Sequence, residues 1–114
     1  IHPNGSIDKS FFNGLALAMT GNGSNAGDYS VALQADGKVL TTSTLTDAFW
    51  IGRHTANGAK DGTWGNKGSL SLPMTNKKDR SYALMVQTDG RIVLVGSTQT
   101  LSNGTDVAIA RLCP

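Results

Sequence analysis

The sequence predicts an all-β fold built from two similar antiparallel units. The first observation behind this prediction is an internal repeat, because one constant shift along the chain places Tyr29 on Tyr82 and Asp36-Gly37 on Asp89-Gly90. The second is that runs of Val, Ile, Leu, Tyr and Thr alternate with clusters of Gly, Asn and Asp, as strands alternate with turns. The third is that no window keeps apolar residues at the helical period, so helices are not expected.

Each unit is expected to form one four-stranded antiparallel sheet. The two units are residues 1–56 and 57–114, and an insertion around Gln99 to Gly104 makes the second one longer. The expected strands, with their counterparts in the second unit, are Leu15–Met19 with Ser69–Met74, Tyr29–Gln34 with Ser81–Gln87, Lys38–Thr44 with Arg91–Ser97, and Ala48–His54 with Thr105–Cys113.

The Asp-Gly pairs are predicted to be hairpin turns. Such a turn needs a positive φ angle, which glycine supplies without steric cost, so Gly37 and Gly90 fit this position. A metal-binding or catalytic role for Asp36 and Asp89 is the alternative, but no second carboxylate lies close to either in sequence. We therefore expect Asp36, Gly37, Asp89 and Gly90 to be structural.

Both faces of the central strands are apolar, which predicts that each sheet is covered on both sides. Tyr82, Leu84 and Val86 alternate with Ala83 and Met85 along one strand. Stacked four-stranded sheets of this kind are the blades of a β-propeller. A propeller takes about four to eight blades, so further repeats are expected, either in the same chain or through self-association. The start at Ile1, without methionine, fits processing or a fragment.

The fourth strands end in arginine, at Arg53 and at its counterpart Arg111. A cation at the end of an apolar strand needs a partner, and Asp61 in the following loop is the expected partner of Arg53. The same loop carries Trp64, and Trp50 lies within the strand before it. Both tryptophans are expected to pack, with carbohydrate stacking or partner contact as the alternative.

Composition and charge argue against several other functions. A formal net charge of +2 with both signs mixed gives no clustered basic face for nucleic acid. Lys77, Lys78 and Arg80 are expected to be a solvated turn rather than a polyanion site. A single cysteine excludes an internal disulfide and a cysteine-rich zinc site, and Cys113 is expected to be buried near a strand end. No metal or cofactor is predicted, and no apolar run is long enough to insert into a membrane.

Several spaced elements resemble the delta-60 repeat, a bacterial β-propeller domain of unknown function. The segments that carry the resemblance are Leu33-Gln34-Ala35-Asp36-Gly37-Lys38-Val39, Val86-Gln87-Thr88-Asp89-Gly90-Arg91-Ile92, Val93-Leu94-Val95-Gly96-Ser97, Ala110-Arg111-Leu112 and Asn4-Gly5-Ser6-Ile7-Asp8. The loop beginning at Asn57 matches less well, and Thr41-Thr42-Ser43 departs from the apolar pattern. The resemblance implies a propeller repeat and carries no catalytic motif.

These observations favour a non-enzymatic segment of a propeller that acts as a structural or adhesive scaffold for protein interactions. The resemblance implies a bacterial protein that is secreted or attached to the cell surface. A glycan-binding propeller that uses Trp50, Trp64 and tyrosines is the alternative. A fragment of a propeller lyase or hydrolase is the third hypothesis, since a fold alone does not define a function.

Overall fold

The structure, a computed structural model, describes residues 1–14, 30–45, 47–102 and 104–113. These residues form two antiparallel sheets and, as their helical element, the short 3-10 helix η1 (Phe12–Gly14). The first sheet has the order β1 (Ser30–Leu33), β2 (Val39–Leu45), β3 (Ala48–His54) and β4 (Ser69–Leu72). The second has the order β5 (Asp79–Val86), β6 (Ile92–Gln99) and β7 (Thr105–Leu112). The predicted all-β fold is confirmed.

The strand boundaries lie close to those expected from residue type. β3 has the predicted ends, and the other described strands differ from prediction by a few residues at one or both ends. The predicted strand Leu15–Met19 lies outside the described residues. The two hairpins that contain Asp36-Gly37 and Asp89-Gly90 join β1 to β2 and β5 to β6.

The predicted grouping of one strand is wrong. Ser69–Met74 was expected to open the second sheet, but β4 pairs with β3 as the fourth strand of the first sheet. The loop after β3 returns the chain to that strand, with the Arg53 amide donating to the Gly68 carbonyl at 2.9 Å. Pairing of Leu70 with Ile51 and of Leu72 with Phe49 then adds two leucines to the apolar face of β3. The sheets therefore do not coincide with units 1–56 and 57–114.

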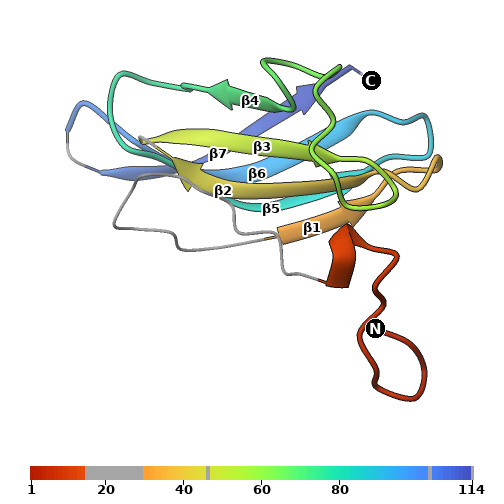
Figure 1. Ribbon diagram of the computed structural model, residues 1–114. Coiled ribbons are helices and arrows are strands. Elements are labelled where there is room, and N and C mark those ends of the chain that lie inside the picture. Colours follow the sequence, from red (N-terminus) through yellow and green to blue (C-terminus); the bar gives the residue numbers. More distant parts are fainter. Residues whose placement is uncertain (15–29, 46, 103, 114) are drawn as a thin grey trace.

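The two sheets pack face to face, as Figure 1 shows, with β5 lying against β1, β2 and β3. Their facing sides form the core, which consists of Leu40, Phe49 and Ile51 from the first sheet and Leu84, Ile92, Leu94 and Ala108 from the second. Leu40, Phe49, Ile51, Ile92 and Leu94 are fully buried. Within the described residues, no helix is long and apolar enough to span a membrane.

Hydroxyl groups join the two sheets where β2 departs from the apolar pattern. Thr42 Oγ1 lies 2.7 Å from the Trp50 carbonyl oxygen and 2.8 Å from Ser81 Oγ. Ser81 Oγ in turn donates to the Ser43 carbonyl at 2.7 Å. Thr42 and Ser81 are fully buried, so these contacts satisfy two hydroxyls that would otherwise be costly inside the core.

The prediction that Tyr82 shares a face with Leu84 and Val86 is wrong. A register shift between Ser81 and Ala83 interrupts the pairing of β5 with β6. Such a bulge breaks the alternation of side chains, so Tyr82 is 45% exposed while Leu84 is buried. The Tyr82 hydroxyl and Ser97 Oγ lie 2.8 Å apart and form a hydrogen bond.

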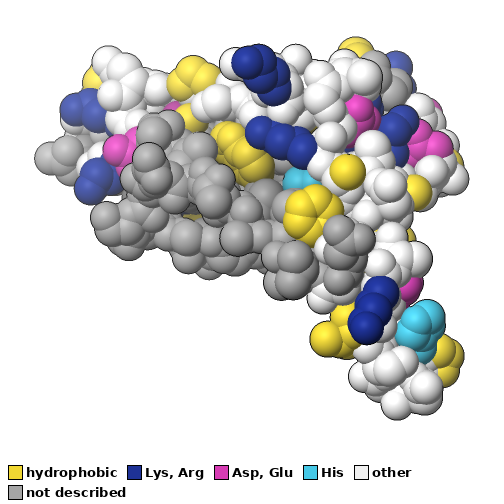
Figure 2. Space-filling view, in the orientation of Figure 1, with side chains coloured by type: hydrophobic (Ala, Val, Ile, Leu, Met, Phe, Trp, Pro, Cys, Tyr) yellow, Lys and Arg dark blue, Asp and Glu magenta, His cyan; other side chains and the backbone are white. Residues whose placement is uncertain are grey.

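The N-terminal residues stand apart from the sheets. Residues 1–11 form a loop that extends away from them and leads into η1 (Figure 1). The space-filling view in Figure 2 shows the same segment projecting from the body, with basic, acidic and histidine side chains at its surface. It is tied to the rest of the chain by a hydrogen bond from the Phe12 amide to the Asn57 carbonyl, 2.8 Å long.

Candidate interaction surface

The second sheet exposes an apolar face on the side away from the first sheet. Its exposed large hydrophobic residues are Met85 (56% exposed), Val95 (39%), Val107 (76%) and Ile109 (64%). Val93 is half-buried on the same face, and Arg111 ends it as an exposed cation. Among the described residues nothing covers this outer side, so the expectation that both faces of these strands are covered stays a prediction that concerns further repeats.

The repeat relates this exposed face to the covered face of the first sheet. The strand pairs β2–β3 and β6–β7 have the same register. Thr42 pairs with Ile51 in the first, and their counterparts Val95 and Ile109 pair in the second. The residues on the covered face of the first sheet and their counterparts on the outer face of the second are Ala32 and Met85, Leu40 and the half-buried Val93, Phe49 and Val107, and Ile51 and Ile109. The two sheets are thus stacked in the same sense, and the outer face of the second is the kind of surface that the first sheet buries.

The structure brings Arg53, Asp61 and Trp64 together at the end of β3. Arg53 Nε donates to Asp61 Oδ2 at 2.9 Å, and the guanidinium lies 5.2 Å from the centre of the Trp64 ring. Asp61 is 4% exposed, and its Oδ1 accepts from the amide and hydroxyl of Thr63. The Thr63 hydroxyl, more than the nearby Arg53, holds the pKa of the Asp61 carboxyl below its usual value. This arrangement locks the loop onto the strand.

The two tryptophans and Arg111 lie at separate places. Trp64 is half-buried and packs against the core, with one face taken by Arg53. The Trp50 ring lies over Gly52, where an added Cβ would be 2.7 Å from Trp50 Cη2. Arg111 is exposed and makes no ion pair with any described residue. The structure thus places neither tryptophan beside the exposed face of the second sheet.

Asp36 and Asp89 lie in turns of the same construction. The Gly37 amide donates to the Gln34 carbonyl and the Gly90 amide to the Gln87 carbonyl, both at 2.9 Å, with φ angles of 81° and 83° at the two glycines. Asp36 accepts from the Lys38 amide and ammonium, and Asp89 from the Arg91 amide and guanidinium. These bonds, led by the Lys38 ammonium and the Arg91 amide, hold the pKa of each carboxyl below its usual value.

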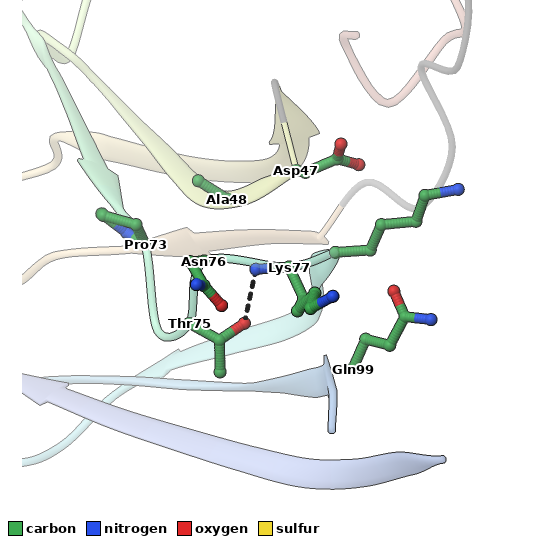
Figure 3. Close-up of a pocket in the computed structure, with 8 residues that line it drawn as sticks. Asp47, Ala48, Pro73, Thr75, Asn76, Lys77 and Gln99 are labelled. Carbon is green, nitrogen blue, oxygen red and sulfur yellow. Dashed lines mark hydrogen bonds between the residues drawn. The ribbon is translucent and has the colours of Figure 1, made fainter. Parts of the chain in front are cut away.

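A cavity of about 460 Å³ opens at one end of the two sheets. Figure 3 shows the β2–β3 turn on one side of it and the loop after β4 on the other, with residues Asp47, Ala48, Pro73, Thr75, Asn76, Lys77, Lys78 and Gln99 in its lining. Lys77 and Lys78, predicted as a solvated turn, are exposed and line this cavity. Ammonium, amide and hydroxyl groups together can donate hydrogen bonds to an oxygen-rich ligand.

Asp79 fixes the loop beside this cavity, and sequence reasoning did not identify it. It is fully buried, and its carboxylate accepts from the Met74 and Thr75 amides at 2.8 and 2.9 Å and from the Thr75 and Thr98 hydroxyls at 2.9 and 2.5 Å. Burial raises the pKa of this carboxyl, but the hydrogen bonds outweigh it, so the pKa lies below its usual value. The repeat gave no signal, since Asp79 aligns with Ala26.

Other candidate chemical groups lie apart. Cys113 was expected to be buried, but it is exposed because it follows the end of β7, where no strand or loop of the described chain covers it. Residues 1–14, 30–45, 47–102 and 104–113 contain no cluster of three His, Cys, Asp or Glu side chains that could hold a metal ion.

His54, at the end of β3, is 4% exposed, and neither ring nitrogen has a hydrogen-bond partner among the described residues. Burial, with a smaller effect of Lys60, lowers the pKa of the ring below its ordinary 6.5. Since the unfolded chain then binds the proton more tightly, the stabilising contribution of the neutral ring is complete above pH 6.5. It is lost as the pH falls from there through the folded-state pKa.

We therefore expect the free energy of unfolding to fall on acidification more steeply in the wild type than in His54→Leu. Leucine is the matched change, because Leu112 is the counterpart of His54. Urea unfolding of both proteins across a pH series measures the difference. If the free energy of unfolding falls equally with pH in both proteins, the pH dependence does not come from His54.

Comparison with known proteins gave one match. The model of a family described as a domain of unknown function (DUF5122) beta-propeller matches residues 87–114, which contain the second Asp-Gly turn, β6 and β7. No curated protein and no solved structure was found to match the chain. The match and the two stacked antiparallel sheets together support a β-propeller repeat from a family of unknown function.

Proposed function

We propose that this chain is a segment of a non-enzymatic β-propeller that acts as a structural and adhesive scaffold by stacking its sheets against those of partners. We further propose that its repeat is of the delta-60 type and that the protein is secreted or displayed on a bacterial surface. The observation that carries the scaffold proposal is the exposed apolar face with Met85, Val95, Val107 and Ile109. Contiguous apolar surface of this kind is characteristic of interaction sites.

Covering this face would contribute substantially to association. Full burial of a Val, Ile or Met side chain contributes about 1.5–3 kcal/mol. Four such side chains therefore supply a sizeable part of the about 4–15 kcal/mol that association costs in lost freedom of movement. The partner we propose is another propeller repeat, because the first sheet already buries the counterparts of these residues.

The test is the double variant Val107→Glu/Ile109→Glu, with Leu101→Glu as a matched control in an exposed loop. Sedimentation velocity over a concentration series is expected to show association of the wild type and the control, and a monomeric double variant. The melting temperature of the monomer is expected to stay unchanged, because both side chains lie outside the core. A wild type that stays monomeric, or a double variant that associates equally, would contradict the proposal.

Glycan binding is the second candidate, and the cavity beside Asp79 supports it rather than the tryptophans. Its size suits a small ligand, and Lys77, Lys78, Asn76 and Gln99 offer donors for the hydroxyls and carboxylate of an acidic saccharide. On a glycan array we expect the wild type to bind acidic saccharides and the control Lys9→Ala to bind them equally well. The double variant Lys77→Ala/Lys78→Ala is expected to bind the same saccharides about tenfold less tightly. An array without any bound saccharide for the wild type removes this candidate.

A further inference from the structure

The cavity beside Asp79 carries charges of both signs on its walls. Asp47, in the turn between β2 and β3, lines it from the first sheet, and Lys77 and Lys78 line it from the loop after β4, so both walls come from loops in the interior of the sequence. All three side chains are exposed, and no ion pair of the described residues joins Asp47 to either lysine. One carboxylate and two ammonium groups can therefore meet a ligand in the same space of about 460 Å³.

Asp79 holds the two walls in a fixed relation. Its amide donates to the Asp47 carbonyl at 3.1 Å, and its buried carboxylate holds the Met74 and Thr75 amides of the loop. The Lys77 amide then donates to Thr75 Oγ1 at 3.1 Å, which is the bond dashed in Figure 3. One buried residue thus positions both the acidic and the basic side of the cavity, so the two sides cannot shift freely relative to each other.

The neutral residues of the lining suit a sugar ring. Asn76 and Gln99 carry side-chain amides, which both donate and accept hydrogen bonds and so match the hydroxyls of a saccharide. Ala48 and Pro73 add small apolar surfaces, against which the C–H groups of a ring can pack. Figure 3 shows Gln99 on the opposite side of the cavity from Ala48 and Asp47, so a bound molecule would lie between the basic and the acidic wall.

We propose that this cavity selects a saccharide that carries both an acidic group and an amino group. Lys77 and Lys78 hold the acidic group, and Asp47 holds the protonated amino group and thereby determines the specificity. This inference rests on the glycan-binding candidate of the proposed function and names its ligand class. A purely acidic saccharide leaves Asp47 without a cation and brings a second negative charge near its carboxylate, so it binds less tightly.

The test is a titration with related sugars below neutral pH, followed by NMR through the backbone amide signals of Asn76, Lys77, Lys78 and Gln99. The sugars are glucuronic acid, its amino form glucosaminuronic acid, and the N-acetyl derivative of that form, which lacks the positive charge. The wild type is expected to bind the amino form about tenfold more tightly than the others, because only this form gives Asp47 a charged partner. Asp47→Asn removes the charge, and asparagine tolerates the φ angle of 56° at this position, so this variant is expected to bind all of them alike.

The matched control is Asp106→Asn, which removes an exposed carboxylate of β7 outside the lining of the cavity and should keep the preference for the amino form. Loss of this preference in Asp47→Asn alone supports the inference. If the wild type binds the sugars equally, or if the preference survives in Asp47→Asn, the role of Asp47 is overturned while glycan binding at the cavity stands. If none of the sugars shifts these amide signals, the glycan-binding candidate falls and this inference falls with it.

Discussion

Gly96→Ala is expected to lower the free energy of unfolding by about 3 kcal/mol or more. A Cβ at this position would lie 2.0 Å from the Arg80 carbonyl oxygen and 2.6 Å from Phe49 Cζ. The carbonyl belongs to the neighbouring strand β5, so it cannot move away without disturbing the pairing with β6, and Phe49 is fully buried between the sheets. The added methyl group therefore forces apart both the second sheet and its packing on the first.

Urea unfolding measures this loss, and Gly62→Ala is the matched control. An added Cβ at Gly62 meets nothing within 4 Å, so its effect is expected to stay within about 0.5 kcal/mol. If Gly96→Ala is as stable as Gly62→Ala, the close approach of Phe49 and of the Arg80 carbonyl to Gly96 is contradicted. The first sheet carries Ser43 at the corresponding place, so the restriction comes from this contact and not from the repeat itself.

Asp79→Ala is expected to cost about 3 kcal/mol, the second large effect. It removes a buried carboxylate that accepts four hydrogen bonds, and a hydrogen bond to a charged group contributes about 1.5–3 kcal/mol. The Met74 and Thr75 amides would lose their acceptor, so the loop that lines the cavity would lose its fixed conformation. Urea unfolding and amide hydrogen exchange at residues 74–78 measure the two consequences.

Asp79→Asn is the control for charge. Its side-chain amide keeps one acceptor oxygen, but its NH₂ group faces amide and hydroxyl donors that had bound the carboxylate. Its stability should fall between those of the wild type and Asp79→Ala. The pKa of Asp79 is lowered in the folded state, so its contribution is fully present above the usual value of 3.8 and is lost as the pH falls from there through the folded-state pKa. Unchanged exchange at Met74 and Thr75 in Asp79→Ala would contradict this role.

Strands and turns could be predicted from the sequence because their causes are local. The Asp-Gly pairs set both hairpins, and the alternation of apolar side chains sets which residues share a face. The proximity of Arg53 and Asp61 could also be anticipated, since a strand-end cation and a carboxylate a short loop away have few other partners. The register repeats in the two Asp-Gly hairpins, where Leu33 pairs with Val39 and Val86 pairs with Ile92, because the turn chemistry repeats.

The partner of β4 could not be predicted, since an internal repeat has no marked beginning. The same sequence period is compatible with Ser69–Leu72 opening one sheet or closing the other, and only the return of the loop to β3 decides between them. The bulge that turns Tyr82 outward and the buried position of Asp79 depend on contacts in three dimensions. The counterpart of Tyr82 is Tyr29, which lies outside the described residues, and Asp79 aligns with Ala26, so the repeat offers no second case from which to read either feature.

The stacking of the two sheets in the same sense underlies the proposed scaffold function. Methyl NOE spectra of the folded chain test it directly. We expect cross-peaks from Leu40 and Ile51 to Leu84, Ile92 or Leu94, whose side chains form one core. Cross-peaks from Leu40 and Ile51 to Val107 and Ile109 instead would place the opposite face of the second sheet inside and contradict the account.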